Sequence, residues 1–417
     1  MNAQLEREAG SARGVFIAAA GLLLVSLLVG GTSRPLNDLI VFLAALPLFF
    51  LLAAGKQGGG IPWTGKLAIA LVALAALQLV PLPPAIWTAF PGRDMAAMAL
   101  EGSGIAIGWR PLALDPGAAA MALATLFSPI VLHIAVARME WPTVRKLLAL
   151  LAGFALFSAI FGVFQRVAGG LNILDTAHAG DSVGFFTNRN HHADLIIAGM
   201  LLLTALLPRE QVDKFRIPLS AAIVLLVFAV VATTSRAGLA LSVPGALAGL
   251  LIIWRPKPQR AFLAGIAILL GGLALLMIPA FNDIFARFAG AADDQRLTMA
   301  RDSLVAARAM WPVGSGYGSF VPVYMAFEDL DMIEALHVVA AHNEYLQLAL
   351  EGGLPGVLGW RLYNGACPAL AWGAWAVAAT LLAHSAFDYP LRTGALAAVF
   401  ALCTGAAHAA GRRLPHA

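Results

Sequence analysis

The chain has 417 residues, of which 60% are hydrophobic and only 12% are charged, and its mean hydropathy is +0.81. Charged residues make up about a quarter of an ordinary soluble domain, so this composition excludes one and indicates a protein that crosses a membrane many times. The formal net charge is only +4.

Apolar runs long enough to cross about 30 Å of hydrocarbon recur along the whole chain. We predict an all-α, polytopic integral membrane protein of about 12 transmembrane helices, with residues 1–417 forming a single integral membrane domain. The first run follows a charged segment and is expected to stay uncleaved. The predicted spans are 14–31, 38–54, 67–82, 117–137, 147–165, 193–207, 217–233, 238–254, 261–281, 346–360, 368–386 and 393–410.

The basic residues predict the orientation of these helices. With the N-terminus inside, all five lysines fall in cytoplasmic segments, as the positive-inside rule requires. The positive charge therefore reflects topology, and no nucleic-acid partner is expected. The two cysteines, Cys367 and Cys403, lie in or beside spans on the cytoplasmic half and are not expected to form a disulfide.

In this topology, four polar segments lie on the non-cytoplasmic face. In chain order they are residues 184–192, residues 233–238, the long loop 282–345 and residues 384–390. The loop is the one long polar interval in the distal half of the chain, and it holds four arginines, a glycine-rich turn at 311–320, and His342 beside Glu344. Charges at helix ends in lipid are costly unless they pair or face water, so we expect one polar cavity that opens outward.

These segments also carry a family resemblance. The chain contains Gly-Phe-x-x-Asn-x-Asn at 184–190, Ser-Arg-Ala-Gly at 235–238, Trp-Pro to Phe at 311–320, His-Asn-Glu at 342–344 with Glu-Gly-Gly-Leu-Pro-Gly at 351–356, and His384 with Asp388. In their order and common side, these elements resemble the O-antigen ligase and polymerase superfamily of bacterial membrane glycosyltransferases.

The resemblance implies an activity and a location. It implies a bacterial inner-membrane protein whose active site faces the periplasm and which transfers a glycan from undecaprenyl diphosphate to an acceptor hydroxyl. The acceptor is a glycan, a lipid A core or another hydroxyl, and membrane lipid surrounds the site. No cofactor and no metal are expected, since His191 and His192 project in different directions and no carboxylate lies at ligand spacing.

Arginines are the predicted ligands of the diphosphate, because a guanidinium stays charged and donates paired hydrogen bonds to phosphate oxygens. Arg236 is the first choice, since it lies at the mouth of two predicted helices beside Ser235. Arg189, flanked by Asn188 and Asn190, is the second. Arg296 and Arg301 are further candidates, although their spacing also fits the wet face of an amphipathic helix.

His342 is the predicted general base, because an imidazole titrates near neutrality. Glu344 could orient His342 or act itself, and the alternative is that His342 and Asn343 only cap the following helix. Tyr317 in the glycine-rich turn could stack on a sugar. His384 is predicted to contribute to the cavity wall, paired with Asp388 four residues later.

The sequence also allows other functions. A multi-helix transporter, including the bicarbonate-transporter type of the same superfamily, would place its ionisable groups nearer the bilayer midplane. The segment 357–383 is short for the family and also allows an inactive scaffold. Between polymerase and ligase, the acidic run Phe327–Glu334 would repel a phosphorylated lipid A core, which favours polymerisation.

The topology can be tested with reporter fusions. Fusions at Gln211 and Pro258 should report the cytoplasm, because these positions lie in lysine-containing connections. Fusions at Ala179 and Asp294 should report the periplasm. A cytoplasmic signal at Asp294 would contradict both the topology and the proposed outward-facing cavity.

Overall fold

The computed structural model describes residues 2–55, 60–169, 171–174, 176, 180–254, 295–329, 338–365 and 372–411. The helices are α1 Asn2–Val29, α2 Pro35–Ala54, α3 Trp63–Ala76, α4 Pro84–Trp87, α5 Arg93–Gly102, α6 Pro116–Thr125, α7 Phe127–Arg138, α8 Trp141–Ala168, α9 Arg189–Leu206, α10 Arg209–Lys214, α11 Arg216–Ala232, α12 Arg236–Trp254, α15 Gln295–Met310, α16 Phe320–Met325, α17 Glu344–Gly365, α18 Trp372–His384 and α19 Gly394–Gly411. Short 3-10 helices occur at Leu77–Leu79 (η1) and Pro390–Arg392 (η5). The strands β1 Pro81–Leu82 and β2 Arg110–Pro111 form one antiparallel pair.

The predicted all-α membrane architecture is confirmed. Six stretches among the described residues are long and apolar enough to cross a membrane: Gly10–Val29, Pro35–Ala54, Pro116–Arg138, Trp141–Ala168, Arg236–Trp254 and Gly394–Gly411. The predicted span at 117–137 is divided into α6 and α7 by a break at Leu126. The predicted span 261–281 lies outside the described residues, and the total of twelve stays a prediction.

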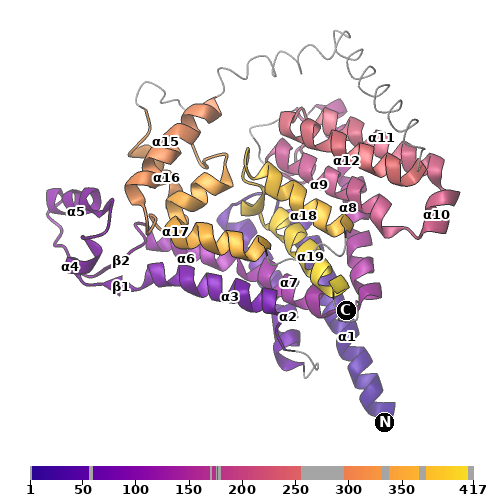
Figure 1. Ribbon diagram of the computed structural model, residues 1–417, viewed down its shortest axis with the longest axis horizontal. Coiled ribbons are helices and arrows are strands. Elements are labelled where there is room, and N and C mark those ends of the chain that lie inside the picture. The colour runs from indigo at the N-terminus through magenta and orange to yellow at the C-terminus, as the bar shows by residue number, and fades with distance from the viewer. Residues whose placement is uncertain are drawn as a thin grey trace, which may run out of the picture.

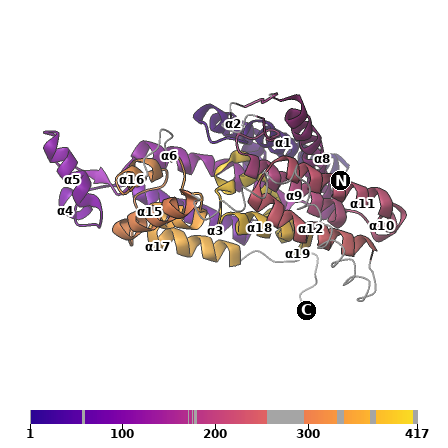
Figure 2. The ribbon, with the colours of Figure 1, turned by 90° about the horizontal axis from the view of Figure 1, so that it is seen from above.

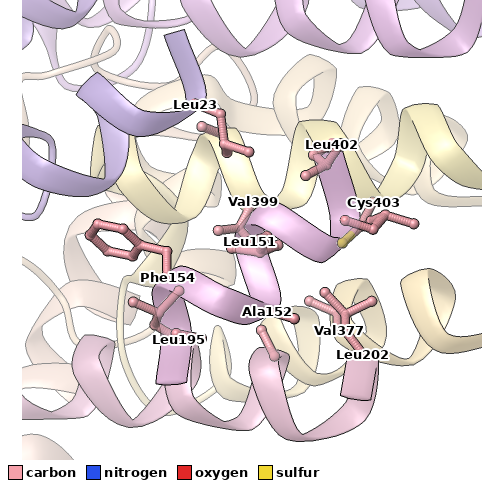
Figure 3. Close-up of a cluster of buried hydrophobic side chains, with 14 of the residues drawn as sticks. Leu23, Leu151, Ala152, Phe154, Leu195, Leu202, Val377, Val399, Leu402 and Cys403 are labelled. Atoms are coloured by element: carbon pink, nitrogen blue, oxygen red, sulfur yellow. The ribbon is translucent and has the colours of Figure 1, made fainter. Parts of the chain in front are cut away.

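The core is formed where α1, α8, α9, α18 and α19 meet. Figure 3 shows Leu23, Leu151, Leu195, Val377 and Leu402 converging there from these five helices. Lipid tails are as apolar as leucine, so close packing rather than water exclusion must hold such helices together, and small residues permit it. A Cβ added to Gly199 of α9 would lie 2.5 Å from the Cβ of Ala155 in α8. The two backbones therefore lie too close together for any larger residue.

A second, smaller unit is built from residues 295–329 of the long loop and the connection between α3 and α6. In both Figures 1 and 2, α4 and α5 project at the end of the molecule far from α10, beside α15 and α16. Arg93 at the start of α5 is almost completely buried, and its guanidinium donates to the carbonyls of Leu112 and, at 2.7 Å, Gly314. A buried guanidinium needs such acceptors, so Arg93 fixes the glycine-rich turn against this connection.

The same turn is held against α17 by a kink in that helix. Gly353 has φ 57° and ψ −151°, which interrupts the helix, and the amide of Leu354 donates to the carbonyl of Pro312 at 2.8 Å. A Cβ at Gly353 would lie 2.2 Å from the same carbonyl oxygen. Only glycine satisfies both the backbone conformation and the contact. The kink therefore sets how the long loop sits on α17.

Gly353→Ala should destabilise the protein by about 1–3 kcal/mol, because it combines a disfavoured backbone conformation with a steric overlap. The thermal unfolding of the detergent-purified protein measures this. Gly153→Ala in α8 is the matched control, since a Cβ there meets nothing within 4 Å. Equal melting temperatures for the two variants would contradict the assigned role of the kink.

Candidate functional site

A cavity of about 1600 Å³ lies between α2, α3, α6, α7, α17 and α19 and the connections at one end of these helices. One part of its wall is polar and includes Asn188, Asn190, His342 and Glu344. The other part is apolar and runs along the helices past Leu71, Met121, Ile130 and Phe400. The cavity thus combines a polar site with an adjoining hydrophobic groove.

Backbone hydrogen bonds gather the predicted polar segments at this site. The amide of Glu344 donates to Ser385 at 2.8 Å, and the amide of Thr187 donates to Gly31 at 3.2 Å. The segment at 233–238 joins them through Thr234, whose hydroxyl accepts a hydrogen bond from Arg189 at 2.9 Å. Four stretches that are distant in the sequence therefore lie together.

Asp388 is the centre of this arrangement. Its side chain is fully buried between α18 and α19, and its Oδ2 accepts from the Nδ2 of Asn190 at 2.5 Å and of Asn188 at 3.5 Å. The Nε2 of His191 lies 3.8 Å from Oδ1, and a guanidinium nitrogen of Arg296 lies 4.0 Å from Oδ2. Burial alone would raise the pKa of Asp388, but the hydrogen bond from His342 and the neighbouring histidine charges hold that pKa well below its usual value. Asp388 is therefore ionised.

His342 lies beside this carboxylate. Its Nδ1 is 3.2 Å from Oδ1 of Asp388, and its ring meets Tyr389 edge-on with 5.0 Å between centroids. An ionised carboxylate can only accept, so Nδ1 carries the proton and Nε2 is left as an acceptor. The backbone of His342 has φ 47°, a conformation rare outside glycine, which turns this residue away from the helix that follows. The geometry is that of a histidine oriented by a carboxylate for proton transfer.

The helix cap is supplied by the next residue. The side-chain oxygen of Asn343 accepts from the amide of Leu346 at 3.1 Å, and its Nδ2 donates to the carbonyl of Ala386 at 3.0 Å. Asn343 therefore caps α17 and ties its start to the end of α18. His342 has no part in the capping bond, and its imidazole is available for the cavity.

Arg34, Arg189 and Arg296 line the same cavity as the His342–Asp388 pair, and so does Arg392, which is paired with Glu351. Arg189 is held by Asp181 at 2.6 Å, and Arg296 donates to the carbonyl of Phe387 at 3.0 Å. Guanidinium groups in a largely apolar recess form an anion-binding surface.

A family comparison agrees with these features. The family model described as O-antigen ligase, Wzy_C, matches residues 221–360. The resemblance to the O-antigen ligase and polymerase superfamily is confirmed. No curated protein matches the chain. The membrane-spanning helices give a multi-pass membrane protein, and the match to the O-antigen ligase model covers residues 221–360 of its 417 residues.

The O-antigen ligase segment includes most of the predicted site residues, but the structure does not bring all of them to the cavity. Arg236 begins α12 and Arg301 lies on an exposed part of α15, and neither lines the cavity. His384 is fully buried, and its Nδ1 lies 2.7 Å from Asp194 rather than bonding to the side chain of Asp388. The residues that do line the cavity are Asn188, Arg189, Asn190, Arg296, Tyr317, His342 and Glu344.

The glycine-rich turn in the matched segment packs closely against α17. The hydroxyl of Tyr317 lies against α17, where a Cβ on Gly352 would come within 2.6 Å of it. The amide of Tyr317 donates to Gln78, whose Nε2 donates to the carbonyl of Glu351 at 3.1 Å. Tyr317 therefore lines the cavity as part of the joint between the loop and α17.

The first residue of the Gly-Phe-x-x-Asn-x-Asn segment must be glycine because the ring of His192 packs against it. A Cβ on Gly184 would lie 2.5 Å from Nε2 of His192, and one on Gly162 would lie 2.3 Å from the same ring. His192 is fully buried with its ring nitrogens near the carbonyls of Ser182 and Ser158, at 3.0 and 3.1 Å. His192 thus fastens this segment to α8, which leaves Asn188 and Asn190 free to reach Asp388.

Sequence reasoning missed three groups of the site: the role of Asp388 as the partner of His342, the Arg392–Glu351 ion pair at 2.9 Å, and Arg34. The sequence did point to the acidic residues of the site. Glu344 and Glu351 lie in motifs that carry the family resemblance, and Asp388 follows His384 by four residues. Arg34 follows the predicted span 14–31, and Arg392 directly precedes the predicted span 393–410. Both positions are typical of ordinary helix-end arginines.

Glu344 has an unusual environment for a carboxylate. Its Oε1 accepts from the amide of Leu391 at 2.7 Å, and Asp388 and Glu351 are close enough to repel its charge. Burial raises the pKa of Glu344 to about 7, although Arg392 opposes the rise. Glu344 is thus divided between its charged and neutral forms near neutral pH.

The raised pKa of Glu344 should make the stability of the protein depend on pH. Because the pKa of Glu344 is raised from 4.5 to about 7 on folding, the folded state binds the proton more tightly, and the stability it contributes is lost as the pH rises through 7. Glu344→Gln should therefore melt higher than the wild type at pH 8, on the order of 2 °C, and equally at pH 5. Glu210→Gln on the exposed α10 is the control. A lower melting temperature for Glu344→Gln at pH 8 would contradict the raised pKa.

Proposed function

We propose that this protein transfers a glycan from undecaprenyl diphosphate to an acceptor hydroxyl at the periplasmic face of the bacterial inner membrane. The observation that carries the proposal is the contact between Nδ1 of His342 and Asp388, 3.2 Å long, in the wall of a cavity that arginines also line. The O-antigen ligase family match supports a lipid-linked glycan donor and a polysaccharide acceptor.

In the proposed reaction, His342 is the general base. The acceptor oxygen attacks the anomeric carbon of the donor sugar, and the hydroxyl proton passes to Nε2 of His342. The bond between the anomeric carbon and the diphosphate oxygen breaks, and its electron pair leaves on undecaprenyl diphosphate. Asp388 holds the imidazole in the required tautomer and stabilises the imidazolium that forms.

The arginines would stabilise the departing diphosphate. Arg296 and Arg189 line the cavity near Asp388 and would donate to phosphate oxygens as negative charge develops. Arg189 is paired with Asp181, so its share of the clamp requires that it exchange this partner for a phosphate. Arg236 remains a predicted contributor, although it begins α12 outside the cavity wall.

The apolar part of the cavity supports a lipid-borne donor. Its lining residues from α3, α6 and α7, including Leu71, Met121 and Ile130, form a hydrophobic groove that is continuous with the polar site. A polyprenyl chain in this groove would place its diphosphate beside the arginines. Hydrophobic burial of the chain would then position the reacting carbon near His342.

Substitution of the His342–Asp388 pair tests the proposal. His342→Asn and Asp388→Asn should each lower glycan transfer by about 10²–10⁴-fold, because the first removes the base and the second removes the charge that fixes its tautomer. The assay uses the carrier-linked glycan that accumulates in a strain lacking the gene, incubated with the purified full-length protein.

Asp213→Asn, in the exposed helix α10, is the matched control and should retain activity. His342→Asn leaves the Asn343 cap intact, so it should still fold and insert while its transfer activity is lost. Transfer at near wild-type rates by His342→Asn would rule out His342 as the base.

A further inference from the structure

The cavity contains a second polar group on the side formed by α17 and η5. Arg392 donates to Oε2 of Glu351 at 2.9 Å, and Oε1 of Glu351 accepts from Gln347 and from the amide of Phe320, both at 3.3 Å. Glu344 stands one turn before Gln347 on the same helix. All four side chains, which we call the carboxylate wall (Glu344, Gln347, Glu351 and Arg392), line the cavity.

The carboxylate wall differs in charge from the arginine side of the cavity. Arg189 is paired with Asp181 and Arg296 lies 4.0 Å from Asp388, whereas the wall carries two carboxylates and the single guanidinium of Arg392. A diphosphate placed against the wall would meet repulsion from Glu344 and Glu351. Sugar hydroxyls both donate and accept, so a mixture of carboxylates, an amide and a guanidinium suits them.

Part of the wall's hydrogen-bonding capacity is unused. The Nε of Arg392 is buried and has no hydrogen-bond partner among the described residues. Oε1 of Glu344 accepts a hydrogen bond from the amide of Leu391. Within the described ranges, Oε2 of Glu344 accepts none. Glu344 therefore gives the wall an acceptor for a ligand, while the guanidinium of Arg392 is held by Glu351.

The wall also lies close to the proposed base along two chain segments. Glu344 follows His342 by two residues, and Arg392 follows Asp388 by four. The same connections that hold the His342–Asp388 pair therefore hold the wall. A sugar bound there would present a hydroxyl close to the imidazole.

We propose that the carboxylate wall is the acceptor subsite and binds the hydroxyl groups of an uncharged saccharide, while the arginine side binds the diphosphate of the donor. This inference rests on the proposed function and specifies the acceptor that it takes. A phosphorylated acceptor is disfavoured, because its phosphates would face Glu344 and Glu351. The end of a neutral growing glycan is the acceptor that the wall fits.

The test separates binding of the donor head from use of the acceptor. Undecaprenyl diphosphate without glycan is the probe for the donor side, measured by its stabilisation of the purified full-length protein. The acceptor probe is the repeat-unit oligosaccharide released from the carrier by mild acid, compared with a phosphorylated lipid A core oligosaccharide. Transfer is measured from the labelled carrier-linked glycan at increasing acceptor concentration.

Glu344→Gln and Glu351→Gln should raise the KM for the neutral oligosaccharide tenfold or more, with undecaprenyl diphosphate binding within twofold of the wild type. Arg296→Ala should show the reverse pattern and weaken undecaprenyl diphosphate binding. Glu210→Gln should change neither quantity. The wild type should use the neutral oligosaccharide in preference to the phosphorylated core.

Equal losses of donor binding and acceptor use in the Glu344 variant would overturn the inference and leave the wall a structural support. Preference of the wild type for the phosphorylated core would overturn it as well. If Glu351→Gln does not fold, Glu344→Gln decides alone, since Glu344 makes no ion pair that the described structure records. A wild-type protein that neither binds undecaprenyl diphosphate nor transfers glycan would instead refute the proposed function.

Discussion

A buried carboxylate in a membrane protein must be compensated, and the compensation of Asp388 organises the site. Its partners come from three places: Asn188 and Asn190 at the start of α9, His342 from the long loop, and Arg296 from α15. Removing one partner of a buried charge costs several kcal/mol, so the ends of these elements are held in one arrangement. His342 is oriented by the same contacts that hold the helices together at this end.

The loop that carries His342 is fixed from its other side by backbone contacts. Arg93 binds the carbonyl of Gly314, Gln78 binds those of Val313 and Glu351, and the kink at Gly353 receives the carbonyl of Pro312. These bonds satisfy buried polar groups that an irregular turn would otherwise leave open. These contacts place the turn against α17, and His342 lies just before that helix.

The cavity divides its chemistry by the helices that supply each side. Arg34, Arg189 and Arg296 come from the connection before α2, the start of α9 and α15, whereas Glu344, Gln347 and Glu351 come from α17 and are joined by Arg392 of η5. The apolar groove runs on between α3, α6 and α7. A charged head, a lipid tail and an uncharged saccharide could each meet matching surface in one cavity, as a transfer between two large substrates requires.

The sequence determined the class of the protein. Charged residues make up only 12% of the chain, too few to cover the surface of a soluble protein, and the apolar runs are long enough to cross a membrane as helices. It also located the polar segments, and with them His342, Glu344, Arg189 and the two asparagines, since costly polar residues at helix ends are kept for a purpose. Only the tertiary structure decided the partners. Asp388 lies 46 residues from His342 and about 200 from Asn190, and His384 pairs with Asp194 instead of its near neighbour. Spacing along one helix predicts local pairs, but the contacts of this site join different helices, and helix packing alone sets which ends meet.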